Sequence, residues 1–161
     1  MIQLLSNGKN RLNHGQVVEK TCFNIMKRQF PELEDRSADW SGMDWYNPTT
    51  KEAIEFKNYN VVSKGEWTIS KEKFDKYRAY IDNTEDVDFG TIWILDNQTN
   101  SEFRINFELV DYLVKTEKVS AKFNRTTRRD WECGIFYCIP LKYFFNITGA
   151  NHCISSYATL K

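Results

Sequence analysis

Two carboxylates and one lysine stand in the chain at a spacing that could bring them together around a metal ion. Asp44 is followed by ten residues and then by Glu55, and Lys57 comes two positions later. The segment Glu52–Asn58 has the apolar content and alternation of a short strand, which places Glu55 and Lys57 on the same face. The intervening Asn47-Pro-Thr-Thr50 has the composition of a turn. We therefore expect Asp44 to end one strand and Glu55 to lie on the next strand of a hairpin.

Two carboxylates that meet in this way repel each other unless a cation joins them. Mg²⁺ suits such a pair because it takes oxygen ligands and keeps several waters, and Mn²⁺ is expected to substitute for it. A lysine beside the ion can hold a water molecule or a phosphate oxygen. An acid two positions before a lysine is also common on exposed hairpins, so the interpretation depends on the residues around this triplet.

The surrounding residues resemble the signature of the PD-(D/E)xK nuclease superfamily, and their order is similar to that of the archaeal-type Holliday-junction resolvases. The resemblance spans about Leu12 to Asp96. Met43 stands where the signature names proline, and residues 115–161 align with no member of the family. The residues that carry the resemblance are Gly15-Gln-Val-Val-Glu19, Gly42-Met-Asp44, Glu55-Phe-Lys57 and Thr68-Ile-Ser-Lys-Glu-Lys73.

This resemblance implies a metal-dependent endonuclease that hydrolyses phosphodiester bonds in DNA with Mg²⁺. By analogy, Asp44, Glu55 and the main-chain carbonyl of Phe56 would bind the metal ion. Lys57 would orient the attacking water or help to deprotonate it, and Glu19 would hold a second ion or its water shell.

The position of Glu19 also follows from a predicted helix that begins at a capping box at Asn13 and continues to about Phe30, before Pro31. Its carboxylate lies on or beside the stripe of apolar residues that the helix buries. Glu19 is therefore either a third acid near the metal ion or a flanking residue whose carboxylate reaches water. The apolar stripe consists of Val18, Cys22, Ile25 and Met26.

Length and composition predict one globular domain over residues 1–161, with 41% hydrophobic residues. The formal net charge is zero, so a nucleic-acid partner requires a local basic surface. No run of about 18 apolar residues is present, which argues against a membrane span. Four cysteines without a Cys-x-x-Cys pair, and no export signal, predict a cytoplasmic protein with reduced thiols.

The remaining pattern predicts an α/β fold, with a restriction-endonuclease-like mixed β-sheet flanked by α-helices and an αβββαβ core. After Lys57 we expect a long connection over the site, up to Glu66. The next elements are a brief strand, a helix capped by Ser70, a buried central strand, a further strand and a last helix. The expected ranges are 67–69, 70–82, 89–95, 102–107 and 107–118, with a final strand at 134–139.

Six basic residues are candidates for DNA contact. Lys64 lies at the tip of the expected connection, and Lys71 lies at the start of the helix capped by Ser70, where a phosphate would relieve the repulsion with the helix dipole. The segment from Ser120 to Arg129 resembles a backbone-binding loop, although it could equally be a solvated connector. Its basic residues are Lys122, Arg125, Arg128 and Arg129.

Three functional alternatives remain open. The favoured function is a structure-selective nuclease similar to a Holliday-junction resolvase, and a sequence-specific restriction or homing endonuclease is the next. A catalytically inactive nucleic-acid-binding module of the same fold belongs to a different class. Because one site cuts one strand, paired cuts predict a homodimer. The aromatic-rich segment Ile135–Phe145 is the candidate interface, unless it completes the core of the monomer.

Overall fold

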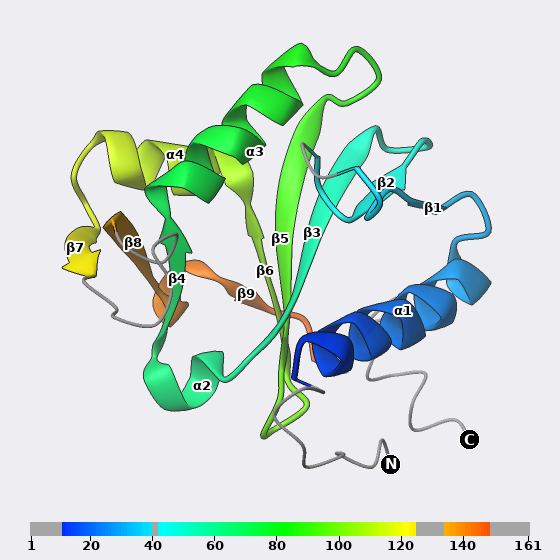
Figure 1. Cartoon of the computed structure of the whole chain (residues 1–161), viewed down its shortest axis with the longest axis horizontal. Helices are drawn as coiled ribbons and strands as arrows, with labels where there is room; N and C mark the ends of the chain where they lie inside the picture. The colour runs from blue at the N-terminus through cyan, green and yellow to red at the C-terminus, as the bar shows by residue number, and fades with distance from the viewer. Residues whose placement is uncertain (1–10, 40–41, 125–133, 149–161) are drawn as a thin grey trace.

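The computed structural model describes residues 11–39, 42–124 and 134–148 (Figure 1). The helices in chain order are α1 (Arg11–Gln29), α2 (Val61–Lys64), α3 (Lys71–Asn83) and α4 (Phe107–Lys115), with a 3₁₀ turn at Leu141–Tyr143. The strands are β1 (Glu34–Asp35), β2 (Trp45–Asn47), β3 (Glu52–Tyr59), β4 (Glu66–Ser70), β5 (Phe89–Asp96), β6 (Glu102–Asn106), β7 (Ser120–Asn124), β8 (Gly134–Pro140) and β9 (Phe145–Asn146).

A six-stranded mixed sheet forms the centre of the molecule, in the order β1-β2-β3-β5-β6-β9. Only β3 and β5 pair in parallel, with Glu55 opposite Ile92 and Lys57 opposite Ile94. The crossover between them contains α2, β4 and α3. Helices flank this sheet, so the predicted mixed α/β class is confirmed.

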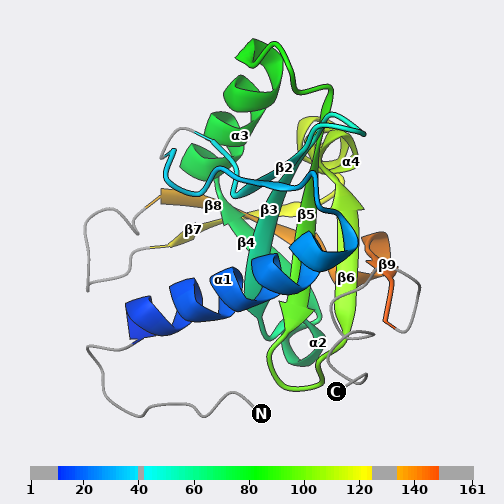
Figure 2. The same ribbon diagram turned by 90° about the vertical axis from the view of Figure 1, so that its right-hand side faces the viewer.

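Period-2 alternation along β3 divides the core into two layers. Ile54 and Phe56 pack with α1 on one face of the sheet, whereas Ala53 belongs to the larger cluster on the other face, which includes residues of α3 and α4. Figure 2 shows α1 crossing β3 and β5, and Figure 1 shows α3 and α4 on the opposite side. Glu55 and Lys57 share the face of Ala53, as the alternation predicted.

A second sheet departs from the predicted outline. The strand expected at 67–69 is present as β4, but it pairs with β8 in a three-stranded sheet of order β4-β8-β7 and does not join the central sheet. The face of this sheet that carries Trp67, Ile69 and Ile139 packs on the larger core cluster. The residues that were expected to extend the main sheet therefore form a separate wall.

Several local boundaries also differ from the sequence-based expectation. The first helix begins at Arg11, two residues before the expected cap at Asn13. The connection after β3 contains the short helix α2, which ends at Gly65 in the left-handed conformation (φ 68°), where glycine has no Cβ to clash. Ser120–Asn124, expected in a loop, forms β7 because it pairs with β8.

The segment Ile135–Phe145 mainly completes the core of this chain, so its assignment as an exposed interface is wrong for most of its length. Strand β8 lies between β4 and β7, and Cys138, Ile139 and Phe144 are buried. Only Ile135 and Phe145 are largely exposed among its apolar residues, at 42% and 73%. None of the described helices is long and apolar enough to cross a bilayer.

Candidate active site

Asp44 lies where the pairing of β2 with β3 stops. Contrary to the expectation that it ends a strand, it directly precedes β2, whose last described pair on this side joins Trp45 and Ile54. Beyond that pair, Asp44 Oδ2 accepts a hydrogen bond from the Phe56 amide at 3.0 Å. The carboxylate thus accepts the hydrogen bond that the main chain of a neighbouring strand would otherwise accept. Because the amide and carbonyl of one strand residue point to the same edge, the Phe56 carbonyl faces Asp44 too.

Gly42, two residues before Asp44, lies where the space for a side chain is limited. A Cβ at Gly42 would lie 2.9 Å from the Tyr80 ring and 3.3 Å from Asp39 Oδ2. Since real Cβ atoms essentially never approach another atom closer than about 3 Å, a larger residue would push the segment away from α3. The close approach of Gly42 to Tyr80 therefore helps to place Asp44 beside β3.

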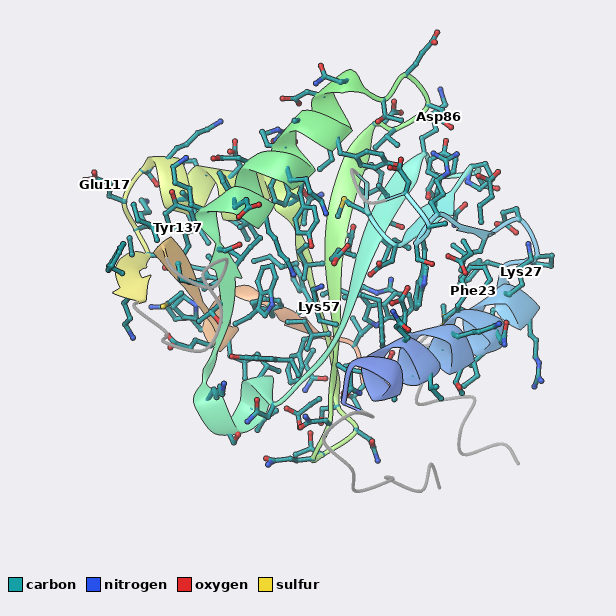
Figure 3. All side chains as sticks on the ribbon, viewed as in Figure 1. Phe23, Lys27, Lys57, Asp86, Glu117 and Tyr137 are labelled. Atoms are coloured by element: carbon teal, nitrogen blue, oxygen red, sulfur yellow. The ribbon has the colours of Figure 1, made fainter. Side chains whose placement is uncertain are left out.

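Glu55 is almost wholly buried, with 5% exposure, and one of its oxygens is shared by two donors. Lys57 Nζ lies 2.5 Å from Glu55 Oε1, and the Tyr77 hydroxyl donates to the same oxygen at 2.7 Å. Figure 3 shows Lys57 between β3 and β4. Tyr77 comes from α3, so a strand and a helix together fix the orientation of the carboxylate.

The remaining oxygens suit a hard cation. Glu55 Oε2 and Asp44 Oδ1 accept no hydrogen bond from any residue that the structure describes. Burial and the nearby Glu55 carboxylate raise the pKa of Asp44 to about 8, as two acids do when no cation separates them. No group of three or more His, Cys, Asp or Glu side chains within the described ranges could hold a metal ion. Two carboxylates fit Mg²⁺, which keeps several of its waters.

Glu19 reaches the same electrostatic environment from α1. Burial raises the pKa of its carboxyl group, and the charges of Glu55 and Asp35 raise it further, while Lys57 acts in the opposite direction. Glu19 in turn contributes to the raised pKa of Asp44. The half-buried Glu19 therefore interacts electrostatically with the charged residues of the site, but its role as a metal ligand stays a prediction.

Lys57 is held in its charged form. Burial lowers its pKa, yet the carboxylates of Glu55 and Asp44 outweigh that effect and leave the pKa above the ordinary lysine value. The ammonium is therefore a hydrogen-bond donor and a positive charge at neutral pH. This state is compatible with orienting a water or a phosphate oxygen, whereas a base would have to lose the proton first.

A cleft of about 580 Å³ opens beside Lys57, between β3, the strands β4 and β8, and the first half of α3. Two further lysines, Lys73 and Lys76, line it, and the charge of Lys57 together with burial lowers the pKa of Lys73. The lining consists of Lys57, Tyr59, Trp67, Thr68, Ile69, Ser70, Glu72, Lys73, Lys76, Tyr77 and Phe136. A concave site with three lysines next to paired carboxylates is suited to a phosphate-bearing ligand.

No protein-family model and no curated protein sequence matches the chain. One solved structure, described as a nuclease from a fusselovirus, aligns with 98% of this chain and 97% of its own, at 12% identity and a TM-score of 0.48.

The described basic residues that were expected to contact DNA all have polar contacts within the chain. Lys64 donates to the Tyr59 hydroxyl at 3.0 Å, and Lys71 pairs with Asp75 at 2.5 Å. Lys122 on β7 lies 3.8 Å from Glu66. Arg125, Arg128 and Arg129 lie outside the described residues. None of the three described lysines lines the cleft, and their contact with DNA stays a prediction.

Tyr77, Lys73 and Lys76 were missing from the predicted site residues. Tyr77 lies in the buried stripe of α3 and is 1% exposed there. Its hydroxyl offered one signal, because a buried tyrosine usually has a hydrogen-bond partner. Lys73 offered another signal, because like Lys71 it lies near the N-terminus of α3, where a phosphate would relieve its repulsion with the helix dipole. Lys76 carried no signal, since lysines on a helix are usually solvated and only the docking of α3 against β3 and β4 places it.

Proposed function

We propose that the protein is a metal-dependent endonuclease that hydrolyses phosphodiester bonds in DNA. The supporting observation is the convergence of Asp44 and Glu55, each with one oxygen left for a cation, beside the charged Lys57 at the wall of a lysine-lined cleft. Surface ion pairs rarely combine burial, opposed carboxylates and a raised carboxyl pKa, and this combination is typical of catalytic sites.

Each residue has a distinct role in this proposal. Asp44, Glu55 and the Phe56 carbonyl hold Mg²⁺, or Mn²⁺ in its place, and Glu19 supports a second ion or its water shell. When bound, the ion supplies positive charge beside the phosphate and makes a nucleophile of water at neutral pH. Lys57 donates to the attacking water or a phosphate oxygen and stabilises charge that develops there. Tyr77 keeps the Glu55 carboxylate in place.

Nicking of plasmid DNA in magnesium tests this assignment. Asp44→Ala and Lys57→Ala should fold normally and lose nicking, while wild type loses it when a chelator removes the metal. Asp82→Ala and Lys115→Ala are the matched controls, because both side chains are more than half exposed and form ion pairs on α3 and α4, away from the site. A rate equal to wild type in either site variant would disprove the assignment. A protein that binds DNA but never cuts it would instead be the inactive binding module.

The finer substrate preference that we propose is branched DNA, because the order of elements resembles the archaeal-type resolvases. Digestion of a four-way junction should be compared with digestion of a matched linear duplex, a single strand and a plasmid. Faster cutting of the junction supports the preference. Equal cutting of all four removes it, and a fixed fragment pattern on the plasmid selects a sequence-specific endonuclease.

Paired cuts lead us to propose a homodimer as well. Sedimentation at micromolar concentration should give a mass near twice 19.1 kDa. Phe145 on β9, at the edge of the central sheet and 73% exposed, is the position to test, whereas Phe144 is buried. Phe145→Asp should lower the mass without unfolding the chain. A monomer that still makes paired cuts would contradict the proposal.

A further inference from the structure

The cleft beside Lys57 has a composition that the phosphodiester chemistry alone does not require. Besides three lysines it contains the aromatic side chains of Tyr59, Trp67, Tyr77 and Phe136. Positive charge interleaved with aromatic rings is typical of surfaces that bind single strands, where the charges follow the backbone and the rings stack on bases.

Phe136 is the aromatic ring best placed for stacking. It is partly exposed, and it makes none of the ring contacts found among the described residues. Strand register sets it directly opposite Ser70, the N-cap of α3, so it stands beside the helix that carries Lys73. By contrast, Trp67 and Tyr77 are buried, and the Tyr59 ring already has the Lys64 ammonium 4.7 Å from its centroid.

The charge and the volume of the cleft further limit the kind of ligand that it can bind. Lys73 is exposed and Lys76 is half-buried, and neither is in an ion pair within the described parts of the chain. The cleft contains one carboxylate, Glu72. Its volume of about 580 Å³ falls within the range of sites for small ligands and accommodates a nucleotide, whereas a continuous duplex covers a broad surface.

We propose that this cleft binds an unpaired nucleotide of the DNA strand next to the phosphodiester bond that is cut. The base stacks on Phe136, and Lys73 and Lys76 bind the adjacent phosphates. This inference depends on the proposed nuclease function for the place of the cut, but the binding itself does not require catalysis. In a branched or frayed substrate, the cleft would recognise a base that is already unpaired, because no energy is then needed to unstack it.

Binding without catalysis provides the test. Fluorescence anisotropy of labelled oligothymidylate, with chelator present, should show tighter binding than a duplex of equal length. Phe136→Ala should weaken the single-strand binding roughly tenfold, in line with the loss of one stacked base. Ile135→Ala is the control, since Ile135 neighbours Phe136 on β8 but does not line the cleft. Phe136→Tyr should keep the affinity, because it retains the ring.

Lys73→Gln provides a second measurement, which leaves the Phe136 ring unchanged. Loss of one phosphate contact should reduce the slope of log affinity against log salt by about 0.7. Unchanged affinity in a folded Phe136→Ala protein, or equal binding of single strand and duplex, would overturn the inference. Tighter binding of oligouridylate than of oligothymidylate would overturn the DNA assignment.

The two proposals can fail separately. A protein that nicks plasmid in magnesium but binds single strand and duplex equally retains the nuclease function and loses this inference. A protein that prefers single strands through Phe136, but whose Asp44→Ala and Lys57→Ala variants cut as fast as wild type, retains this inference and loses the site assignment.

Discussion

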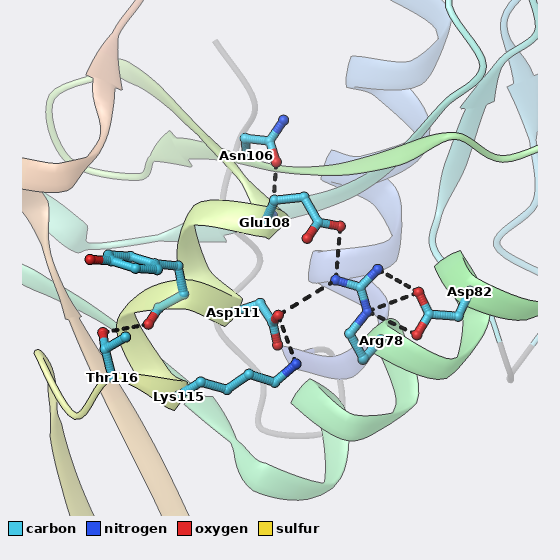
Figure 4. Close-up of polar contacts among 8 residues, drawn as sticks. Arg78, Asp82, Asn106, Glu108, Asp111, Lys115 and Thr116 are labelled. Carbon is cyan, nitrogen blue, oxygen red and sulfur yellow. Dashed lines mark hydrogen bonds and ion pairs between the residues drawn. The ribbon is translucent and has the colours of Figure 1, made fainter.

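Helix α3 contacts two clusters of charged residues, and only one of them has the properties of a reaction site. On one side, the Tyr77 hydroxyl donates to Glu55, which also pairs with Lys57, and the charge of Asp44 acts on Tyr77 as well. On the other side, Arg78 joins Asp82 and Glu108, as Figure 4 shows. Arg78 and Lys115 both approach Asp111, at 3.8 and 2.9 Å. Adjacent residues of one helix thus belong to two different environments.

The difference lies in burial and in how the charges are matched. Asp82 and Glu108 are 54% and 55% exposed, so water screens them, and the guanidinium of Arg78 bridges them. In the other cluster, Glu55 is buried, and the pKa of Asp44 is raised by burial and by the charge of Glu55. Ion pairs of this kind stabilise helix packing, although the buried acid of the network, Asp111, leaves its Oδ1 without a hydrogen-bond partner among the described residues. Asp44 and Glu55, by contrast, oppose each other beside the cleft and need a cation. The number of charges alone would not have separated the two.

The largest expected effect on the nicking rate is that of Glu55→Gln, and the same substitution at Glu108 in the other cluster is its comparison. Glu55→Gln keeps the shape and an oxygen that can accept from Tyr77, but removes the negative charge needed to hold a cation. We expect the nicking rate in magnesium to fall at least about 100-fold. Glu108→Gln should leave the rate unchanged. Rates of plasmid nicking, normalised to folded protein, give the comparison, and equal losses in both variants would remove the distinction between the clusters.

Tyr77→Phe should have a smaller effect, on the order of 10- to 100-fold in nicking rate, because it removes the donor that orients Glu55 but leaves both carboxylates. Weaker magnesium binding should accompany the loss, so a higher magnesium concentration should restore part of the rate. A purely structural role would lower the melting temperature without changing the magnesium dependence, and this outcome would contradict a positioning role.

The fold was predictable to the extent that local patterns determine it. The apolar run of β5, the alternation of β3 and the Ser70 cap of α3 each carry their own signal, and Ser70 accepts from the Lys73 amide as a cap does. The pairing of β4 with β8 carried no such signal. Five residues of β4 cannot specify whether their partner lies in the central sheet or some 70 positions later in sequence.

The site was predictable only where its residues are close in sequence. Asp44, Glu55 and Lys57 are joined by one hairpin, so a turn and a period-2 strand were enough to bring them together. Tyr77 comes from another element, and nothing in the sequence around it distinguishes a core tyrosine from one that donates to a carboxylate. Lys64 and Lys71 were predicted to contact DNA from their positions at a loop tip and a helix start; both form local contacts, and their contact with DNA stays a prediction.

Asp44→Asn should stabilise the metal-free protein. The pKa of Asp44 is about 8 in the folded protein, compared with an ordinary value of 3.8 for an aspartate in the unfolded chain. As the pH rises, the unfolded chain therefore loses this proton first. Asp44 consequently lowers the stability of the folded protein increasingly from about pH 4 to pH 8. In chelator at pH 8 we expect a gain of about 1–3 kcal/mol, less than the full pKa difference because water and side chains relax around the charge. At pH 4 the gain should vanish.

Thermal unfolding at the two pH values measures this effect, and Asp82→Asn is the control, since its exposed carboxylate should give no gain at either pH. Magnesium should raise the melting temperature of wild type and leave that of Asp44→Asn nearly unchanged. A loss of stability in Asp44→Asn at pH 8 would mean that the charged Asp44 is already compensated in the fold.

The smallest effect is expected for Arg78→Lys, which tests the cluster assigned to packing. Lysine keeps the positive charge but loses the planar fork that reaches Asp82 and Glu108 together. Because both acids are largely exposed, the cost in unfolding free energy should stay below about 1 kcal/mol. The nicking rate and its magnesium dependence should equal those of wild type, although Arg78 directly follows Tyr77 in the chain. A clear fall in nicking rate with unchanged stability would show that the two sides of α3 are coupled. The Arg78 cluster could then no longer be treated as a packing network separate from the reaction site.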